Sequence, residues 1–106
     1  MVARGDIWLA ALDPAVGSEI RKTRPCVVVS PPEMHDHLRT VIVAPMTTGS
    51  RPGPYRIPVI HAGKKGLILL DQIRTLDKAR LARKWGAVNA RTLSAALRTL
   101  QEVFGE

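Results

Sequence analysis

The chain has 106 residues, of which 45% are hydrophobic and 24% are charged, so its size and composition are those of one globular domain rather than a disordered segment. Sixteen Lys and Arg residues against nine Asp and Glu residues give a formal net charge of +7, which predicts an anionic partner such as nucleic acid, an acidic protein or a membrane surface. The apolar runs are shorter than the roughly 18 residues of a membrane span, and no signal-peptide pattern opens the chain, so we expect a single cytoplasmic domain over residues 1–106.

Five short apolar runs in the first two thirds of the chain are rich in Val, Ile and Leu and have the length of β-strands. They cover residues 7–12, 26–30, 40–46, 55–60 and 66–70. Pro and Gly residues lie in the gaps between them, which is typical of turns. Short strands separated by such turns predict a mainly antiparallel sheet that curls into a small barrel.

The hydrophobic period changes near the C-terminus. Apolar residues recur there at helical spacing, at Leu93, Leu97, Leu100, Val103 and Phe104. Asn89 is suited to cap the start of a helix and Gly105 to end it, so we expect an amphipathic helix over residues 90–104 that lies against the sheet. Residues 84–88 predict a last short strand, and residues 77–82 a single helical turn.

Three of the apolar runs do not alternate with polar residues. They are Val27-Val28-Val29, Val41-Ile42-Val43 and Leu67-Ile68-Leu69-Leu70, and such runs are typical of strands covered on both faces. One helix cannot cover both faces of a five-stranded sheet. We therefore expect that the sheet closes on itself and that a second copy covers the rest, as in a symmetric homodimer.

A polar, basic loop leads into the second predicted strand. Pro25 restricts Arg24 to extended backbone, and proline is tolerated at the first residue of a strand. Arg24 would then be held at the rim of the sheet, where a guanidinium can bind a phosphate through two hydrogen bonds. The alternative is an exposed arginine in a turn.

Two polar pairs follow later strands. Thr47 and Thr48 end the third strand, and their hydroxyls either donate to a phosphoryl oxygen or satisfy the backbone of the turn. Asp71 and Gln72 come directly after a buried strand, and a buried carboxylate needs partners. We interpret this pair as a clamp on a neighbouring loop or basic side chain, with recognition of a base edge as the alternative.

The sequence gives little support to a metal site or to a reactive cysteine. His35 and His37 would share one face of an extended segment, as half of a metal site, but no companion cluster has ligand spacing, so we expect no metal and no cofactor. The single cysteine, Cys26, excludes an intrachain disulfide and a multi-thiolate zinc site. It is expected to be a small core side chain, with a thiol pKa lowered by Arg24 as the alternative. His61 is expected on the surface, in a turn.

Three segments taken together resemble the MazF/PemK family of bacterial toxins. They are Arg4-Gly5-Asp6-Ile7-Trp8, then Gly17-Ser18-Glu19 with Arg24-Pro25-Cys26-Val27-Val28-Val29-Ser30, and finally Leu70-Asp71-Gln72-Ile73-Arg74-Thr75-Leu76-Asp77. The strand ending in Thr47-Thr48 fits as well, so the resemblance extends from Gly5 to the final helix. It implies a small SH3-like antiparallel β-barrel with a C-terminal helix, a fold shared with the CcdB toxins, and a homodimer.

The resemblance also implies an activity. Members are metal-independent, sequence-specific endoribonucleases that cut single-stranded RNA, mostly mRNA, and so inhibit translation. Attack of an RNA 2′-OH on its own 3′ phosphate leaves a 2′,3′-cyclic phosphate and a 5′-OH end. A cognate acidic antitoxin silences the enzyme, which suits a protein of charge +7. The alternative is a CcdB-like, non-enzymatic inhibitor of DNA gyrase, but those proteins lack the Arg24-Pro25 and Thr47 pairing.

By the same resemblance Arg24 and Thr47 are the catalytic residues, and a one-residue shift would select Thr48 instead. The proton acceptor is left between Asp71 and Glu19, because this chain has Leu69 and Ser18 where some members carry an arginine and a histidine. Basic residues gather between Lys78 and Gln101, either as a nucleic-acid surface or as a solvated face. The residues expected to contact RNA are Ser18, Arg21, Lys22, Thr48, Ser50, Arg51, Gln72, Arg83 and Lys84.

Overall fold

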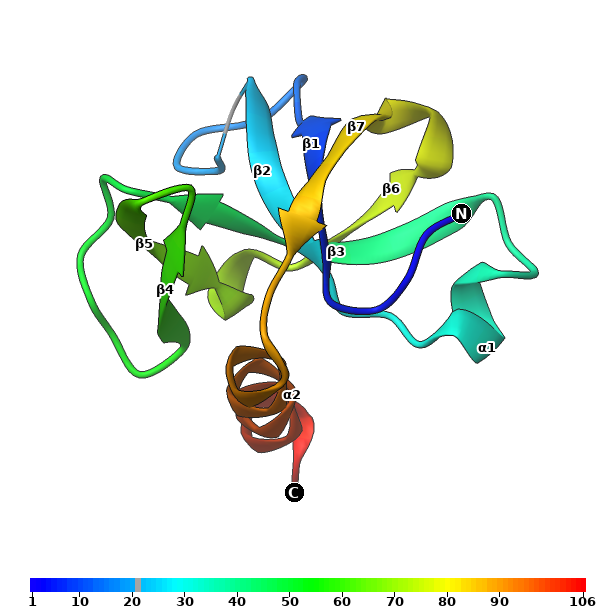
Figure 1. Cartoon of the computed structure of the whole chain (residues 1–106). Helices are drawn as coiled ribbons and strands as arrows, with labels where there is room; N and C mark the ends of the chain where they lie inside the picture. Colours follow the sequence, from blue (N-terminus) through cyan, green and yellow to red (C-terminus); the bar gives the residue numbers. More distant parts are fainter. Residues whose placement is uncertain (21) are drawn as a thin grey trace.

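The computed structural model describes residues 1–20 and 22–106, which form a curled β-structure with one long helix beneath it (Figure 1). The strands are β1 (Asp6–Ala11), β2 (Thr23–Val28), β3 (Thr40–Thr47), β4 (Arg56–His61), β5 (Lys64–Leu69), β6 (Arg74–Asp77) and β7 (Leu81–Ala87). The helices are α1 (Pro32–His35) and α2 (Ala90–Phe104), with 3-10 turns η1 (Leu70–Gln72) and η2 (Lys78–Arg80). The predicted mainly β fold with a C-terminal helix is confirmed.

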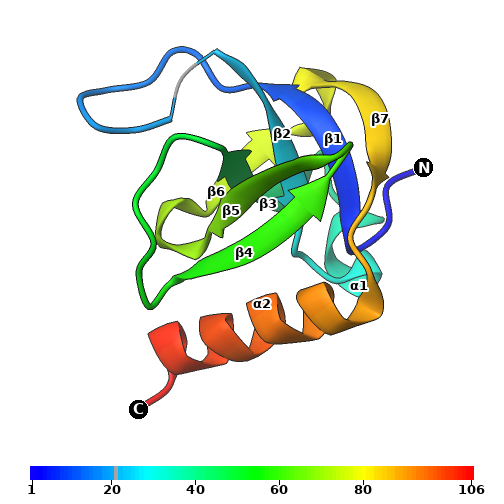
Figure 2. The same ribbon diagram turned by 60° about the vertical axis from the view of Figure 1, so that its left-hand side comes forward.

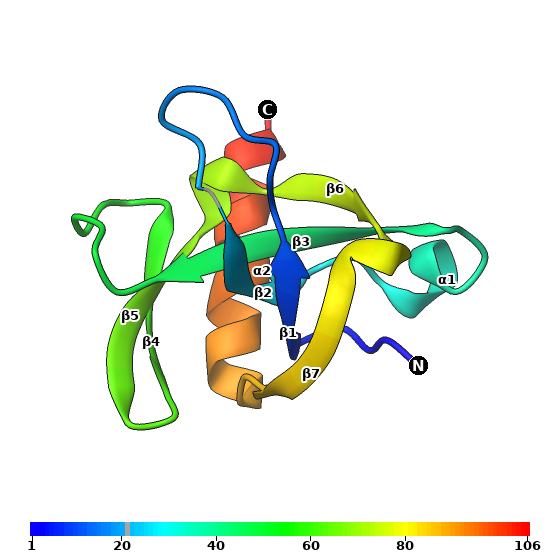
Figure 3. The same ribbon diagram turned by 90° about the horizontal axis from the view of Figure 1, so that it is seen from above.

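The strands pair antiparallel in the order β4-β5-β3-β2-β1-β7, and β6 pairs with the first half of β3. Strand β3 spans the molecule from the β4–β5 hairpin to α1 (Figure 3). Its last residues pair with β5, and the hairpin folds back across the sheet toward β7 (Figure 2). The two ends of the sheet meet where His61 packs on Gly86, whose φ is +132° and where a Cβ would lie 2.8 Å from the imidazole Cε1. Only glycine allows this closure.

Apolar side chains fill both faces of the central strands. One cluster lies under the β4–β5 hairpin and α2, and includes Ile7, Val27, Ala44, Met46, Val59, Ile68, Leu70 and Ala96. The other lies on the opposite face and includes Ala10, Leu12, Cys26, Val28, Val41, Val43 and Leu76. The runs that do not alternate are therefore covered on both faces within one chain. They give no independent argument for a second copy.

Helix α2 has the predicted bounds. The Asn89 side chain accepts a hydrogen bond from the backbone N–H of Thr92 at 2.8 Å, which satisfies one of the free amides of the first turn. Ala96 and Thr99 are buried against the sheet. Gly105 follows with an ordinary φ of −72°, so the helix ends there without using the left-handed freedom of glycine. Among the described residues, no helix has both the length and the apolar character that a membrane crossing requires.

Four local features differ from expectation, the first being that β7 runs from Leu81 to Ala87 rather than over residues 84–88. Strand β6 was not predicted, because Leu76 is the one buried side chain of its four residues, and pairing with β3 stabilises it. Helix α1 forms in the segment that would have to be extended for His35 and His37 to share one face. Strand β2 begins at Thr23 rather than at Cys26, so Pro25 lies inside the strand and pairing with β1 positions Arg24 opposite Ala10.

Candidate active site

Arg24 and Thr47 come together at the place where β2 begins and β3 ends. The register between β2 and β3 pairs Cys26 with Pro45 and Val27 with Ala44, and continuing it by two residues brings Arg24 beside Thr47. Both side chains are half-buried. Both line one hollow of about 160 Å³, whose other lining residues are Pro25, Met46, Thr48, Val59, His61, Lys64, Gly66 and Trp85. The hollow thus combines two cationic groups, two hydroxyls and two aromatic rings.

The backbone around Thr47 orients its hydroxyl. The Oγ1 atom accepts a hydrogen bond from the N–H of Gly49 at 3.2 Å, and because a hydroxyl carries one hydrogen and two lone pairs, that hydrogen stays available for donation. Gly66 on β5 packs directly on the Thr47 backbone, since a Cβ there would lie 2.8 Å from the Thr47 carbonyl oxygen. Thr47 is therefore held by Gly49, two residues further along the chain, and by Gly66 on β5.

The structure places several other predicted residues in a neighbouring hollow of about 370 Å³. Its lining residues are Leu12, Ser18, Glu19, Ile20, Pro45, Asp71, Gln72, Ile73 and Arg74. Pro45 and Thr47 are two residues apart on β3, so the two hollows lie next to each other along that strand. Ser18, Glu19, Asp71 and Gln72 are thus grouped together, but apart from Arg24 and Thr47.

Asp71 forms an ion pair with Arg56, which the sequence analysis did not single out. The Arg56 guanidinium donates to both carboxylate oxygens, at 3.2 and 3.0 Å, and to the carbonyl of Arg51 at 3.2 Å. The hydrogen bonding to Asp71 raises the pKa of Arg56 above its ordinary value. The pair clamps the loop between β3 and β4, which agrees with the structural interpretation of Asp71.

Gln72 and Arg74 clamp the loop between β1 and β2. The side-chain oxygen of Gln72 accepts from the N–H of Ile20 at 2.9 Å, and Arg74 donates to the carbonyl of Leu12 at 3.1 Å. Within the loop, the Glu19 carboxylate accepts from the N–H of Val16 at 2.6 Å. The loop before Arg24 is therefore attached to the segment that follows β5.

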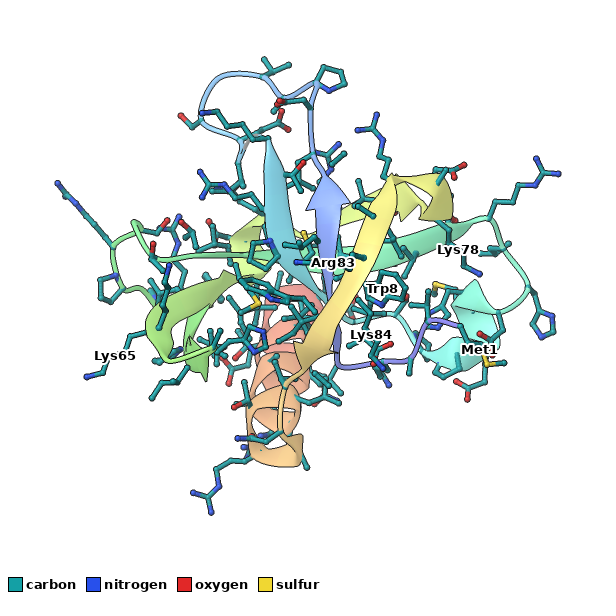
Figure 4. All side chains as sticks on the ribbon, turned by 45° about the horizontal axis from the view of Figure 1, so that its top comes forward. Met1, Trp8, Lys65, Lys78, Arg83 and Lys84 are labelled. Carbon is teal, nitrogen blue, oxygen red and sulfur yellow. The ribbon has the colours of Figure 1, made fainter. Side chains whose placement is uncertain are left out.

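The predicted basic face divides into two groups. Lys78 and Arg80 donate to backbone carbonyls, and Lys84 lies 3.3 Å from the buried carboxylate of Asp6. Arg83 differs, because it pairs with Leu9 while Lys84 pairs with Trp8, so the two side chains point to opposite faces of β7 (Figure 4). Leu9 also pairs with Pro25, which lines the 160 Å³ hollow. Arg83 thus lies on the face of Pro25 and Lys84 on the other face.

The remaining predicted RNA contacts lie on loops. Ser50 is half-buried and Arg51 is exposed in the β3–β4 loop, and Lys22 is exposed just before β2. Lys22 adopts a φ of +67°, which is uncommon for a residue with a side chain. Arg21 lies outside the described residues.

His35 is a buried structural residue. Its Nε2 donates to the carbonyl of Val2 at 3.0 Å and its Nδ1 accepts from the hydroxyl of Ser30 at 2.8 Å. The helical turn of α1 leaves His37 exposed, so the two imidazoles do not share one face as an extended segment would require. Within residues 1–20 and 22–106, no three His, Cys, Asp or Glu side chains are grouped so that they could hold a metal ion.

Cys26 is a core residue, as predicted, with no exposed surface. Burial raises the pKa of its thiol to about 12, and the charge of Arg74 offsets only part of that effect. The alternative of a thiol activated by Arg24 is therefore wrong. The free-energy cost of desolvating the thiolate exceeds its attraction to the Arg74 guanidinium.

The buried thiol should make stability depend on pH in the alkaline range. The folded chain holds this proton more tightly than the unfolded chain, whose thiol has the ordinary value of 9.0. The contribution is complete below pH 9 and is lost as the pH rises from 9 toward 12, at about 1.4 kcal/mol of unfolding free energy per pH unit. Denaturant titrations between pH 8 and 11 should show this slope in wild type and not in Cys26→Ala. Equal slopes in both proteins would contradict the assignment.

Sequence reasoning missed the contact that closes the hollow. His61 is the last residue of β4 rather than part of a turn, and it is half-buried. Its ring packs edge-to-face on Trp85, with centroids 4.9 Å apart. The one local signal was a tryptophan beside a glycine in a basic, strand-like segment. That signal cannot show which loop reaches the tryptophan.

Comparison with known proteins agrees with this geometry. The family of PemK-like, MazF-like toxins of type II toxin-antitoxin systems matches residues 3–104. An endoribonuclease MazF of Staphylococcus epidermidis is 40% identical over 90 residues, which cover 79% of this chain and 75% of that protein. The crystal structure of MazF from Deinococcus radiodurans superposes with a TM-score of 0.83 at 26% identity, over 100% of this chain and 97% of the other.

The fold is also that of an endoribonuclease from a mycobacterial species, solved in complex with its cognate antitoxin. That structure gives a TM-score of 0.83 at 23% identity, and covers 99% of this chain and 96% of the other. These relatives give no support to the alternative of a CcdB-like gyrase inhibitor. The chain belongs to the PemK-like, MazF-like toxin family of type II toxin–antitoxin systems and is an endoribonuclease.

Proposed function

We propose that this toxin cleaves single-stranded RNA at the hollow that Arg24 and Thr47 share. The observation that carries the proposal is the β2–β3 register, which brings a guanidinium and a hydroxyl to one place from two separate strands. Together they supply up to three hydrogen bonds to a phosphate. They are also the two residues that the family resemblance identifies as catalytic.

The reaction that fits this site is an internal transfer on RNA. The 2′-oxygen forms a bond to the adjacent phosphorus, its proton passes to a base, and the bond from phosphorus to the 5′-oxygen breaks as that oxygen gains a proton. The products are a 2′,3′-cyclic phosphate and a 5′-OH end. Negative charge increases on the phosphoryl oxygens in the transition state, so donors that are already in place lower the barrier. We assign this role to Arg24 and Thr47, since an arginine that stays protonated is a poor base.

We keep Glu19 and Asp71 as the proposed proton acceptors. Both line the neighbouring hollow, so either would act on an RNA strand that spans both hollows. Both oxygens of Asp71 already accept hydrogen bonds from Arg56. Glu19, at the exposed surface of the β1–β2 loop, is therefore the better placed of the two. Ser18 and Gln72 would contact the same strand, and Ser50 and Arg51 would contact it from the β3–β4 loop.

The proposal is tested by incubating the purified protein with a long single-stranded RNA, mRNA being the natural choice, in excess EDTA. We expect discrete fragments with 5′-OH ends, because the site offers hydrogen-bond donors rather than metal ligands. The Arg24→Ala protein, purified in parallel, controls for contaminating nucleases. Intact RNA, or cleavage that stops with EDTA and returns with a divalent ion, would overturn the mechanism. Stalled gyrase–DNA complexes with intact RNA would favour the gyrase-inhibitor alternative.

Two partners accompany this proposal. The antitoxin would be an acidic protein that competes with RNA for a chain of charge +7, and both would meet the toxin in the cytoplasm. The homodimer rests on the family resemblance rather than on the apolar strands, which are covered within one chain. Light scattering should then report about twice the chain mass of 11.6 kDa.

The division of the basic face predicts different salt dependences for two adjacent residues. Arg83 lies on the face of Pro25, so Arg83→Gln should remove about one phosphate contact and reduce the slope of log K against log salt by roughly 0.7. Lys84 neutralises the buried Asp6, so Lys84→Gln should leave the slope unchanged and lower the melting temperature. The measurement is a titration of 2′-O-methyl RNA, which cannot be cleaved, at several salt concentrations. An unchanged slope in Arg83→Gln would assign Arg83 to the solvated face.

A further inference from the structure

Trp85 is an exposed aromatic residue within the hollow that contains the catalytic pair. It lies on β7, 39% of its surface is accessible, and it lines the same space as Arg24, Thr47 and Lys64. Tryptophan usually buries most of its large apolar surface. An accessible ring among cationic groups is instead the arrangement that proteins use to stack the unpaired bases of single-stranded nucleic acids.

The direction of the Trp85 side chain follows from an irregularity in the sheet. The pairing of β1 with β7 shifts between Ile7↔Gly86 and Trp8↔Lys84, so that Trp85 is an extra residue without a partner on β1. Such a bulge interrupts the strict alternation of side chains and redirects one of them. Here it turns the indole toward the β4–β5 hairpin, where it meets His61.

His61 holds this ring in place through two contacts. The two rings meet edge-to-face, at 82° and a centroid distance of 4.9 Å, and Nε2 of His61 donates to the carbonyl of Trp85 at 2.9 Å. The absence of a side chain at Gly86 lets the imidazole approach this closely. A ring that is already fixed loses little conformational entropy when a ligand packs on it.

We propose that Trp85 is a stacking platform for a nucleobase next to the scissile phosphate, with His61 as the residue that positions it. An edge-to-face contact uses at most one face of the indole, and the accessible part of the ring receives the base. The base would then fix its own nucleotide while Arg24 and Thr47 engage the adjoining phosphate. This inference rests on the proposed function, because it assigns the substrate an orientation in that same site.

Direct observation of stacking does not require cleavage. In a Trp8→Phe background Trp85 is the sole tryptophan, and its fluorescence should be quenched when 2′-O-methyl decamers of U, A or C bind. Quenching should occur with all three, since stacking tolerates every base. A 2′-O-methyl decamer with abasic sites throughout should bind without quenching. Binding of the base-containing decamers with no change in Trp85 emission would overturn the inference even if the enzyme cleaves RNA.

Kinetics on an RNA that carries a mapped cleavage site give the second test. Trp85→Ala should raise KM on the order of 10-fold to 100-fold with little change in kcat, because a stacked base stabilises bound substrate and transition state alike. Trp85→Phe should recover most of the loss, and His61→Ala should show a smaller effect than Trp85→Ala. Phe104→Ala is the matched control, since Phe104 is 71% exposed on α2 and does not line the hollow.

An abasic substitution in the substrate separates stacking from a merely structural role. If Trp85 stacks on a flanking base, removing that base should raise KM for wild type and have no further effect on Trp85→Ala. The inference would be overturned if, at both flanking positions, the increase in KM from the abasic substitution added fully to the increase from Trp85→Ala. A wild-type KM in Trp85→Ala would overturn it as well. A wild-type protein that quenches on binding but never cleaves would contradict the proposed function and leave the stacking platform supported.

Discussion

Replacement of Arg24 with alanine should lower kcat by about 10²–10³-fold, which corresponds to roughly 3–4 kcal/mol of lost transition-state stabilisation. In the proposed mechanism the guanidinium faces a phosphate whose oxygens gain charge only as the reaction proceeds, so its loss should affect kcat far more than KM. Arg24 is half-buried at the start of β2 rather than in either apolar cluster, and the free energy of unfolding should change by less than about 1 kcal/mol.

Arg24→Lys is the matched control for charge. An ammonium keeps the positive charge but cannot form the planar contact with two phosphoryl oxygens, so this variant should not recover activity. The measurement is single-turnover cleavage of the mapped RNA, with affinity for 2′-O-methyl RNA recorded in parallel. Cleavage at the wild-type rate by Arg24→Ala would remove Arg24 from the mechanism, whereas full recovery in Arg24→Lys would reduce its role to that of a point charge.

The second large effect is expected at Thr47. Thr47→Ala removes the hydroxyl that we propose donates to the phosphate, and it should also cost about 10²–10³-fold in kcat. Thr47→Ser keeps the hydroxyl and the hydrogen bond that it accepts from Gly49, so it should recover activity in part. Recovery is partial because the lost methyl group lets the side chain adopt more rotamers.

Thr48→Ala tests the register of the site. Thr48 lines the same hollow but is exposed, and it follows the last residue of β3. Its replacement should therefore affect kcat much less than replacement of Thr47. If Thr48→Ala were inactive and Thr47→Ala active, the catalytic hydroxyl would be one residue further along the chain. RNA affinity and melting temperature, measured for all three variants, distinguish a chemical effect from a loss of structure.

The sequence predicted those elements whose signals are local. Helix α2 carries its own period, and Asn89 caps it through a bond to Thr92, three residues away. Strand β6 carries no comparable signal in its own residues. It is stabilised by its backbone pairing with β3, which is distant in the sequence. The sequence also did not show that Arg24 lies within β2, because a proline is expected at the first residue of a strand. Here Pro25 lies inside the strand, and both of its neighbours, Arg24 and Cys26, pair with β1.

The residues alone left the candidate site undecided. Taken separately, Arg24 could have been an exposed arginine in a turn, and Thr47 could have served only the backbone of a turn. Only the family resemblance connected the two residues. Their meeting depends on the register between two strands, which no short segment encodes. The contact between His61 and Trp85 depends on a hairpin that folds back across the whole sheet. The ion pair that holds Asp71 comes from Arg56, fifteen residues earlier in the chain.

The clamp formed by Arg56 and Asp71 has a consequence for how this enzyme can change its target. The 48–55 segment is attached at one end to β3 and at the other to this ion pair, which lies outside the 160 Å³ hollow. Gly49 orients the Thr47 hydroxyl and Thr48 lines the hollow, but the other residues between these two attachments can be exchanged without altering the strands that position Arg24 and Thr47. The segment is thus a replaceable cassette, in which sequence preference can evolve, or be engineered, while the catalytic rate is preserved.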